Sequence, residues 1–272
     1  MAPTQSLQTM FPKQLATGIL TARFGDERRQ FRAGVYSRRE IWRSMAAAAV
    51  LVLVLTGLSA ERPLRPITVT DTQSGLKAYV LVLPPEQNRG FCIVDVPARK
   101  EGDNIRAHWR AEYELMFNGG FFDTTNFTPA AYCVINGVKM NPVINTRWSG
   151  MLAIDQDGAI HLLWRTNDVS GYHSVLQAGP YVIDPGGAIG IKSRSGPIGQ
   201  RTLVGFTHKR ELVIMVTESI HLYDLAYAVK RQMPQIERLL NLDGGPSSGF
   251  KCETLEILNE WPVRNYVAKK KQ

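Results

Sequence analysis

The chain has 272 residues, 44% of them hydrophobic, and a formal net charge of +8 at pH 7. Residues 1–44 supply a net charge of +5, with eight Lys or Arg against three Asp or Glu, whereas residues 61–272 hold 24 against 21. The overall charge therefore gives no ground for a nucleic-acid partner, and we expect none. The 212 residues that follow position 60 suffice for one sizeable hydrophobic core in a single domain.

The N-terminal part of the sequence predicts export. Residues 1–44 are basic, and residues 45–60 form an uncharged apolar segment of 16 residues, shorter than the roughly 20 that a spanning helix needs. Ser37–Arg43, SRREIWR, matches a twin-arginine export motif, although an ordinary basic flank fits as well. Leu58-Ser59-Ala60 is an imperfect cleavage site, so both a cleaved signal peptide and an uncleaved anchor stay open. We expect the export machinery as a partner and a periplasmic or inner-membrane-anchored domain, with membrane contact only through residues 45–60 if they are kept.

From residue 61 onward, short apolar or β-branched segments alternate with turn residues, a pattern that predicts strands. The predicted strands include Ile67–Thr70, Leu76–Leu83, Phe91–Val96, Tyr113–Phe117, Met151–Asp155, Ala159–Trp164, Thr202–Thr207 and Glu211–Thr217. Asn136-Gly137 predicts a two-residue hairpin, because both central residues of such a turn need positive φ. Helices are predicted at Asn104–Ala111 and at Leu222–Gln232, which Pro234 ends. We expect one compact α+β domain over residues 61–272, with a mostly antiparallel sheet and few helices, behind the signal or anchor segment.

Two glycine-containing segments combine turn residues with polar side chains. Asn118–Asp123, NGGFFD, follows an apolar strand, and its two glycines let the backbone approach a ligand. Its first and last residues supply an amide and a carboxylate. Gln177–Pro180, QAGP, places a second amide beside a Gly-Pro pair that stops a strand. Each segment, taken alone, also fits a purely structural turn.

Two further segments predict an anion site. Arg201 and Thr202 begin a strand after a loop rich in Ser, Gly and Pro, and the planar guanidinium of arginine matches phosphate oxygens. Asn241–Gly249, NLDGGPSSG, places Asp243 at the end of a strand and follows it with glycines, a proline and two hydroxyls. Successive N–H groups in such a loop form an anion-binding concavity. The lysine and the spacing of a Walker loop are missing.

In chain order, the four segments resemble the motifs of the phosphodiester glycosidase domain family, in an uncovering-enzyme-like, bacterial exported form, over about residues 67–267. The resemblance implies an α+β domain whose motif loops converge on one pocket. It also implies hydrolysis of the glycosidic bond of a sugar-1-phosphodiester, small or polymeric, to the sugar and a phosphomonoester. No epidermal-growth-factor-like module is present, so the sugar and the aglycone are not implied. The positions that match the family motifs are Asn118, Gly119, Gly120, Asp123, Gln177, Gly179, Pro180, Arg201, Thr202, Asp243, Gly244, Gly245, Ser247 and Ser248.

The residue types suggest roles in that reaction. Arg201 and the Gly244–Ser248 loop are assigned to the phosphate, because clamping an acidic leaving group matters more than protonating it. Asp243 is assigned to the anomeric carbon or its attacking water, with Asp123 as the second catalytic carboxylate. The remaining candidates are Asn118 and Gln177 for sugar hydroxyls, and Asp184 and Glu218 as reserve carboxylates.

Two other functions stay open at the level of sequence. One is a non-catalytic envelope module that binds a glycan or phosphoglycan in the same pocket, which would tolerate the loss of Asp243. The other is a phosphodiesterase that cuts the P–O bond rather than the C–O bond. Hydrolysis in ¹⁸O-labelled water distinguishes this last alternative from a glycosidase.

Cysteines and histidines show no metal-binding pattern. Cys92, Cys133 and Cys252 are widely spaced, and in an oxidising compartment they allow at most one disulfide and leave one odd thiol. The five histidines form no HxH or HxxxH pair, so we expect no zinc site. Asp123 and Asp243 are compatible with Ca²⁺ or Mg²⁺, but no ligand spacing demands a metal, and we expect no cofactor.

Overall fold

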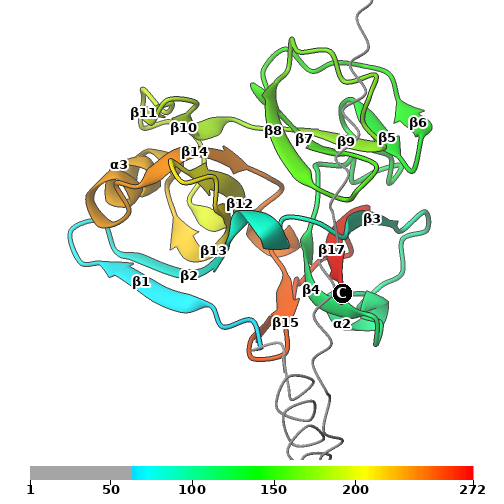
Figure 1. The fold of residues 1–272 in the computed structure, drawn as a ribbon, viewed down its shortest axis with the longest axis horizontal. Coiled ribbons are helices and arrows are strands. Elements are labelled where there is room, and N and C mark those ends of the chain that lie inside the picture. Colours follow the sequence, from blue (N-terminus) through cyan, green and yellow to red (C-terminus); the bar gives the residue numbers. More distant parts are fainter. Residues whose placement is uncertain (1–62, 272) are drawn as a thin grey trace, which may run out of the picture. The chain divides into compact units, whose positions relative to one another are not determined.

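The computed structural model describes residues 63–271, so the basic region 1–44 and the apolar segment 45–60 lie outside the described residues. The described chain forms three antiparallel sheets, two α-helices and two short 3₁₀ helices (Figure 1). The predicted α+β class, with mostly antiparallel strands and few helices, is confirmed. Neither α-helix has the length and the apolar character that a membrane crossing requires.

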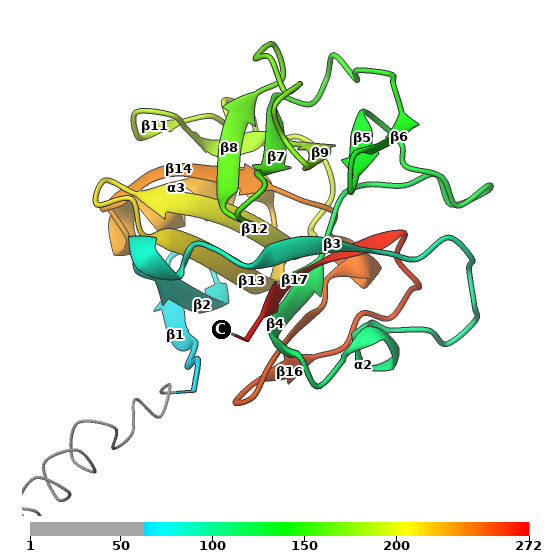
Figure 2. The ribbon, with the colours of Figure 1, turned by 45° about the vertical axis from the view of Figure 1, so that its right-hand side comes forward.

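The first sheet has seven strands in the order β1-β2-β13-β12-β14-β10-β11. Its strands are β1 (Ile67–Asp71), β2 (Leu76–Leu83), β10 (Tyr181–Asp184), β11 (Ala188–Ile189), β12 (Gly199–Thr207), β13 (Leu212–Ile220) and β14 (Ile236–Asn241). β12 pairs with both β13 and β14, although helix α3 (Leu222–Gln232) separates the last two in the sequence. Figures 1 and 2 show α3 lying beside this sheet.

Two five-stranded sheets complete the domain, in the orders β16-β15-β4-β17-β3 and β6-β5-β9-β7-β8. The former contains β3 (Phe91–Asp95), β4 (Tyr113–Asn118), β15 (Phe250–Cys252), β16 (Glu256–Ile257) and β17 (Asn265–Lys270). The latter contains β5 (Cys133–Ile135), β6 (Val138–Asn141), β7 (Gly150–Ile154), β8 (Ile160–Trp164) and β9 (Ser174–Ala178). The short helices are α2 (Ile105–His108), η1 (Pro85–Gln87) and η2 (Gly245–Ser247).

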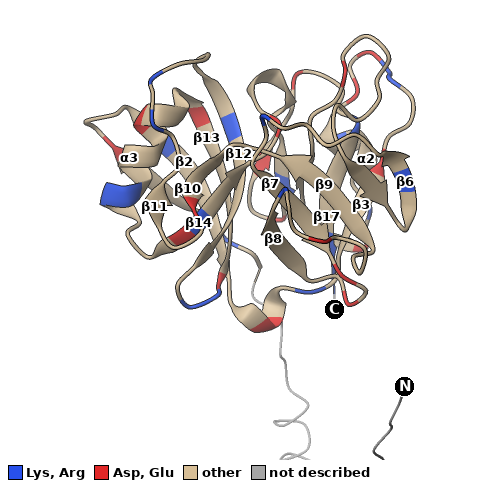
Figure 3. Cartoon of the chain, turned by 90° about the horizontal axis from the view of Figure 1, so that it is seen from above, with Lys and Arg blue, Asp and Glu red and all other residues tan. Residues whose placement is uncertain are grey.

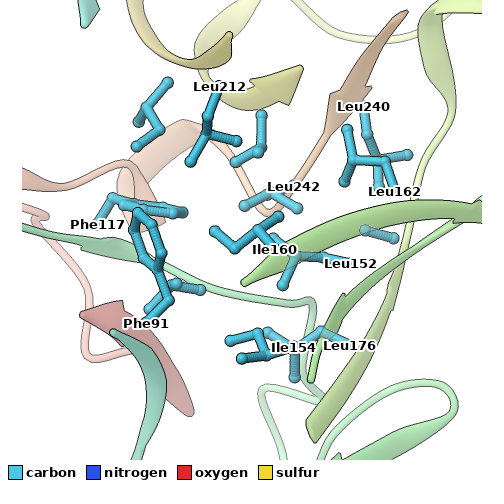
Figure 4. Packing of buried hydrophobic residues seen from close by; sticks show 14 of the residues in the cluster. Phe91, Phe117, Leu152, Ile154, Ile160, Leu162, Leu176, Leu212, Leu240 and Leu242 are labelled. Atoms are coloured by element: carbon cyan, nitrogen blue, oxygen red, sulfur yellow. The ribbon is translucent and has the colours of Figure 1, made fainter. Parts of the chain in front are cut away.

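The main hydrophobic core lies where the three sheets meet. Its buried side chains include Phe91, Phe117, Leu152, Ile154, Ile160, Leu162, Leu176, Leu212, Leu240 and Leu242 (Figure 4). A second cluster joins Leu225 and Val229 of α3 to Leu203 and Leu239 of the first sheet. Because side chains alternate between the faces of a strand, Leu239 faces α3 while Leu240 faces the main core. The first sheet is therefore buried on both faces.

Local signals account for most of the observed boundaries. Helix α3 spans the predicted residues, and His221 Nδ1 accepts a hydrogen bond from Tyr223 N (3.1 Å) at its N-terminus. The predicted hairpin is confirmed, with φ of 51° at Asn136 and 77° at Gly137.

The helix predicted at Asn104–Ala111 is shorter than expected. Asn104 caps it by accepting a hydrogen bond from Arg106 N (3.1 Å), but Trp109 is already extended, with φ −67° and ψ 132°. The helix therefore ends after a single turn, and the chain passes directly into β4.

The three cysteines are free in the structure. Cys133 and Cys252 are buried in the main core, and burial raises the pKa of the Cys133 thiol to about 12. These two residues therefore pack as small hydrophobic side chains rather than as reactive thiols.

Basic and acidic side chains are interspersed over the described residues (Figure 3). Many of them form ion pairs, such as Arg231 with Asp71 (2.6 Å) and Arg194 with Asp224 (2.8 Å). An arginine that lacks such a partner is therefore informative about function.

Candidate active site

Strands β12 and β14 bring two of the sequence motifs together. They are antiparallel neighbours, and Leu242 N donates a hydrogen bond to Thr202 O (2.8 Å) just beyond the end of β14. One pair beyond Thr202 and Leu242, the same register would place Arg201 opposite Asp243. Directly opposite residues of an antiparallel pair have Cα atoms about 4.5–5.5 Å apart, with their side chains on the same face.

Strand alternation decides which side chains enter the site. Leu203 packs toward α3, whereas Leu242 belongs to the main core. Arg201 lies two residues before Leu203, and Asn241 and Asp243 flank Leu242. These three polar side chains therefore share the face that α3 covers further along the sheet.

A cavity of about 330 Å³ opens at this end of the two strands. Its volume lies within the range of small-molecule sites. Its lining residues are Phe121, Pro197, Ile198, Gly199, Arg201, Asn241, Asp243, Gly244, Gly245 and Pro246. Three of the four motif segments thus contribute to one cavity, and Gln177–Pro180 does not line it.

Arg201 is a buried cation that has no carboxylate within ion-pair distance in the described part of the chain. Only 8% of the surface of Arg201 is exposed to solvent. Its guanidinium donates hydrogen bonds to Ile220 O (3.3 Å) and to Pro197 O. Arg264, also buried, instead bonds the carboxylate of Asp95. Burial lowers the pKa of Arg201, yet a guanidinium stays protonated at physiological pH. Because an unpaired buried charge is costly, the site favours an anionic ligand.

Asp243 is the carboxylate of the cavity. Its Oδ1 accepts a hydrogen bond from Gly244 N (2.8 Å). Burial raises the pKa of Asp243 to about 6, and hydrogen bonds from the Ser247 hydroxyl and the Gly244 amide offset part of this rise. Asp243 and Arg201 line the same cavity without forming an ion pair with each other. A carboxylate that titrates near pH 6 suits a base that works near neutrality.

The loop after Asp243 does not form the cradle of N–H groups that the sequence suggests. Most of its amides donate within the protein: Gly244 N to Asp243 Oδ1, Ser247 N to Gly244 O, Ser248 N to Gly245 O and Gly249 N to Asn118 Oδ1. Ser248 is fully buried and does not line the cavity. Gly245, with φ of 60°, keeps an N–H with no acceptor within residues 63–271. Of the groups predicted to bind the phosphate, the Arg201 guanidinium and the Gly245 amide are therefore the ones left free to do so.

Asn118 holds the backbone of the site through hydrogen bonds. It is fully buried at the end of β4, and its Nδ2 donates to the backbone oxygen of Asp243 (2.8 Å). Its Oδ1 accepts from Thr202 Oγ1 (2.6 Å) and from Gly249 N (3.1 Å). The prediction that Asn118 binds a sugar hydroxyl gains no support from this arrangement, because both ends of its amide are bonded within the protein. Asn118 and Thr202 instead fix the backbone that carries Asp243.

Gly119, directly after β4, allows the chain to lie close to Asn265 of β17. A Cβ on Gly119 would lie 2.0 Å from Asn265 Oδ1, the same oxygen that accepts a hydrogen bond from Gly120 N (2.9 Å). Gly119 O also accepts from Asp243 N (3.3 Å). Gly119 therefore positions the segment that carries Asp243, and neither glycine lines the cavity.

Gln177 does not line the cavity but bonds the segment that carries Trp148. Its Oε1 accepts from Asn145 N (2.8 Å), and its Nε2 donates to Asn145 O (2.6 Å) and Trp148 O (3.2 Å). The Trp148 ring stacks on Phe121, a cavity residue, with 4.4 Å between ring centroids. The predicted contact between Gln177 and a sugar hydroxyl therefore gains no support from its position, since its amide is bonded to the backbone of Asn145 and Trp148.

Gly179 and Pro180 support Asn241. Asn241 N donates to Pro180 O (3.1 Å), and Asn241 Nδ2 donates to Gly179 O (3.3 Å). A cis peptide bond joins Gly179 to Pro180. A Cβ on Gly179, whose φ is 153°, would lie 2.7 Å from Ser149 N. This segment therefore shapes the backbone behind the cavity.

Asp123 is not brought to the cavity. It is exposed, and its Oδ1 caps a turn by accepting from Thr125 N (2.7 Å) and Asn126 N (3.2 Å). The prediction that Asp123 is the second catalytic carboxylate therefore gains no support from its position.

An Asp123→Asn variant is expected to keep kcat/KM within about threefold of wild type, because an asparagine oxygen can cap the same turn. Steady-state kinetics on a sugar-1-phosphodiester check this expectation. A loss of a hundredfold or more would return Asp123 to the catalytic machinery.

The two reserve carboxylates lie elsewhere. Asp184 ends β10, and Glu218 pairs with Lys77 at the surface. Neither lines the cavity. Within residues 63–271, no group of three or more His, Cys, Asp or Glu side chains has the arrangement of a metal site.

A larger cavity, of about 580 Å³, lies at the opposite end of β12 and β14. Several of its polar side chains already have partners: His161 bonds Asp155 (2.7 Å), and Arg238 bonds Glu237 (2.5 Å). It contains no buried, unpaired charge comparable to Arg201, so the smaller cavity is the better candidate site.

Some residues of the site are not predicted from the sequence. Asn241 lines the cavity, Phe121 and Trp148 form an aromatic wall and its support, and Asn265 holds the glycines of the first motif. Asn241 could have been found by alternation, because it lies two residues before Asp243 at the end of a strand. Asn265 and Trp148 carry no such signal, since only the pairing of distant segments brings them to the site.

Comparison with known proteins places this geometry in context. The model of the phosphodiester glycosidase family matches residues 111–269. The fold is similar to the zebrafish N-acetylglucosamine-1-phosphodiester alpha-N-acetylglucosaminidase catalytic domain auto-inhibited by its pro-peptide. The TM-score is 0.59 at 14% identity, over 79% of this chain and 86% of that chain. No curated protein matches the sequence.

Two further solved structures share the fold. A hypothetical protein from Synechocystis has a TM-score of 0.52 at 11% identity, over 75% of this chain and 61% of that chain. A candidate exported protein from Burkholderia pseudomallei K96243 has a TM-score of 0.52 at 12% identity, over 73% and 74%. The family match covers more than half of the chain and all four motif segments. This chain therefore belongs to the phosphodiester glycosidase family.

Proposed function

We propose that the chain is an exported hydrolase that cleaves the glycosidic bond of a sugar-1-phosphodiester and releases the sugar and a phosphomonoester. The observation that carries the proposal is the pair formed by Arg201 and Asp243, a cation and a carboxylate that line one cavity without bonding each other. A phosphate fits beside the guanidinium, and the anomeric carbon beside the carboxylate. The zebrafish relative is named for hydrolysis of a sugar-1-phosphodiester, which supports the reaction class but not the choice of sugar.

In the proposed reaction, the bond from the anomeric carbon to the phosphate oxygen breaks, and water supplies the oxygen that replaces it on carbon, directly or in a second step. The phosphate leaves with the bonding electrons, and Arg201 and the Gly245 amide stabilise its charge. Ionised Asp243 either accepts the proton of the attacking water or attacks the carbon to form an ester that water then hydrolyses. Because phosphate is an acidic leaving group, no second carboxylate has to protonate it, and the proposed reaction uses no cofactor.

We place the reaction outside the cytoplasm. The basic region and the apolar segment 45–60 support export, and one relative of the same fold is described as an exported protein. The substrate is then a small or polymeric sugar phosphate of the envelope.

Turnover of a panel of sugar-1-phosphodiesters in ¹⁸O-labelled water tests the proposal. Glycosidic cleavage places the label in the released sugar, because water attacks carbon. Label in the phosphate would instead identify a P–O phosphodiesterase. Tight binding of the panel without turnover would identify a glycan-binding module.

Arg201→Ala is expected to raise KM for the phosphodiester about 10- to 100-fold, because each charge-assisted hydrogen bond to a phosphate contributes roughly 1.5–3 kcal/mol. Arg194→Ala is a matched control, since Arg194 lies in the preceding loop and pairs with Asp224 at the surface. Initial-rate kinetics on both variants measure the effect. An unchanged KM in Arg201→Ala would count against a phosphate clamp at this residue.

A further inference from the structure

Asn241, which lines the proposed catalytic cavity, carries a buried side-chain oxygen, Oδ1, that has no hydrogen-bond partner in the described part of the chain. The residue is 3% exposed, and its Nδ2 donates to Leu242 O (2.8 Å) and Gly179 O (3.3 Å). These two bonds fix the orientation of the amide, because only the nitrogen can donate to carbonyl oxygens. Oδ1 therefore points away from them, and it has no donor within residues 63–271.

The position of this oxygen follows from strand geometry. Asn241 ends β14, and both Asn241 and Asp243 line the cavity, whereas Leu242 between them is buried in the main core. Residues two apart in an extended strand lie about 6–7 Å from each other along it. A single oxygen atom can therefore lie within hydrogen-bond distance of both side chains. The Asp243 carboxylate is already placed at the reacting carbon by the proposed function.

Leaving a buried acceptor unbonded is costly compared with an apolar residue of the same size. An amide oxygen accepts hydrogen bonds and cannot donate them. Phosphate oxygens at neutral pH are also acceptors, so they do not satisfy Asn241 and belong at Arg201 and the Gly245 amide. The group that Asn241 requires is a donor, and the donors that every sugar-1-phosphodiester reaction supplies are sugar hydroxyl groups and water.

We propose that Asn241 Oδ1 accepts a hydrogen bond from an O–H group at the reacting centre and thereby orients it beside Asp243. This inference rests on the proposed glycosidase function and assigns Asn241 a contact with substrate. The O–H group belongs either to a sugar hydroxyl next to the anomeric carbon or to the hydrolytic water. The two sources have the same chemistry at Asn241 and differ in what they predict for altered substrates.

The test combines Asn241→Ala and Asn241→Ser with a series of deoxy sugars in the same phosphodiester. Both variants are expected to lower kcat/KM about 10- to 100-fold on the intact substrate. If a sugar hydroxyl is the donor, the deoxy substrate that lacks it loses a similar factor with wild type and loses nothing further with Asn241→Ala. If water is the donor, each deoxy substrate loses the same factor in kcat/KM with Asn241→Ala as with wild type. The ratio of methanolysis to hydrolysis in methanol–water mixtures then differs between the variant and wild type.

Asn88→Ala is the matched control. Asn88 is a structural asparagine at the larger cavity, where its amide bonds both backbone groups of Ile160 (2.9 and 3.0 Å). Its replacement removes a similar pair of hydrogen bonds and should leave kcat/KM within about twofold. Thermal unfolding of each variant separates loss of fold from loss of function. If Asn241→Ala does not fold, Asn241→Ser, which keeps one hydroxyl donor for the carbonyls, carries the comparison.

The outcomes separate this inference from the function on which it rests. Wild-type turnover with near-normal kcat/KM in both Asn241 variants would overturn the inference alone. Reduced activity with additive deoxy effects and an unchanged methanolysis ratio would also overturn it, because Asn241 would then contact neither source. No wild-type turnover of any sugar-1-phosphodiester would overturn the proposed function and the inference together.

Discussion

Asp243→Asn is expected to lower kcat on a sugar-1-phosphodiester by roughly 10²–10⁴-fold while the fold is kept. The carboxylate lines the cavity beside Arg201, and an asparagine there can neither accept the proton of water nor attack the anomeric carbon. The same substitution should stabilise the protein at neutral pH. Single-turnover kinetics and thermal unfolding of one preparation measure both effects.

The stabilising effect follows from the titration of Asp243. Its pKa is about 6 in the folded protein and about 3.9 in the unfolded chain, so the folded state binds more protons between these values. The free energy of unfolding therefore falls as pH rises through this window, by about 3 kcal/mol for this group. Asp243→Asn removes that loss, so its Tm should equal or exceed that of wild type above pH 6.

The pH dependence of activity runs in the opposite direction. The proposed reaction needs ionised Asp243, so kcat/KM should rise with pH and level off above about 6. Asp184→Asn provides the control for a half-buried aspartate outside the cavity. Near-normal turnover by Asp243→Asn, or an activity that falls as pH rises through 6, would remove Asp243 from its assigned role.

Gly119→Ala is expected to destabilise the domain by about 2–4 kcal/mol and to abolish most activity. The new Cβ would lie 2.0 Å from Asn265 Oδ1, so this side chain must move and break its bond to Gly120 N. Overpacking costs about 1–3 kcal/mol, and a buried unpaired amide a similar amount. Because Gly119 O also bonds Asp243 N, the catalytic loop shifts with the strand.

Gly120→Ala provides the neighbouring comparison for stability. A Cβ at this position has its nearest contact, Leu176 Cβ, at 3.5 Å, an ordinary van der Waals distance. Denaturant unfolding should therefore place Gly120→Ala within about 1 kcal/mol of wild type. Equal stability of the Gly119 and Gly120 variants would show that the close approach of β4 and β17 is not what requires glycine at position 119.

The sequence predicts the local structure of this domain well, because much of it depends on signals that neighbouring residues carry. Helix α3 has a clear apolar face and a proline after its end, and the Asn136-Gly137 turn has a strict requirement for positive φ. The sequence also identifies the segments that contribute Arg201 and Asp243 to the cavity.

The roles of the supporting residues could not be predicted in the same way. Asn118 and Gln177 are amides beside glycines, and nothing in their own segments shows that other parts of the chain use up their hydrogen bonds. Those partners, such as Thr202 for Asn118 and Asn145 for Gln177, are 84 and 32 residues away. Asp123 was similarly ambiguous, since a carboxylate after a glycine turn serves equally well as a cap.

The register between β12 and β14 has a consequence for how substrate preference can change. Arg201 lies on β12, and Asp243 follows the end of β14, where Leu242 N still bonds Thr202 O, so the pairing of these two strands holds the two residues near each other. Ile198 and Pro246, by contrast, lie on the loops that rim the cavity, and Ile198 is 69% exposed. Substitutions in those loops can therefore reshape the entrance of the cavity without changing the strand pairing that positions Arg201 and Asp243.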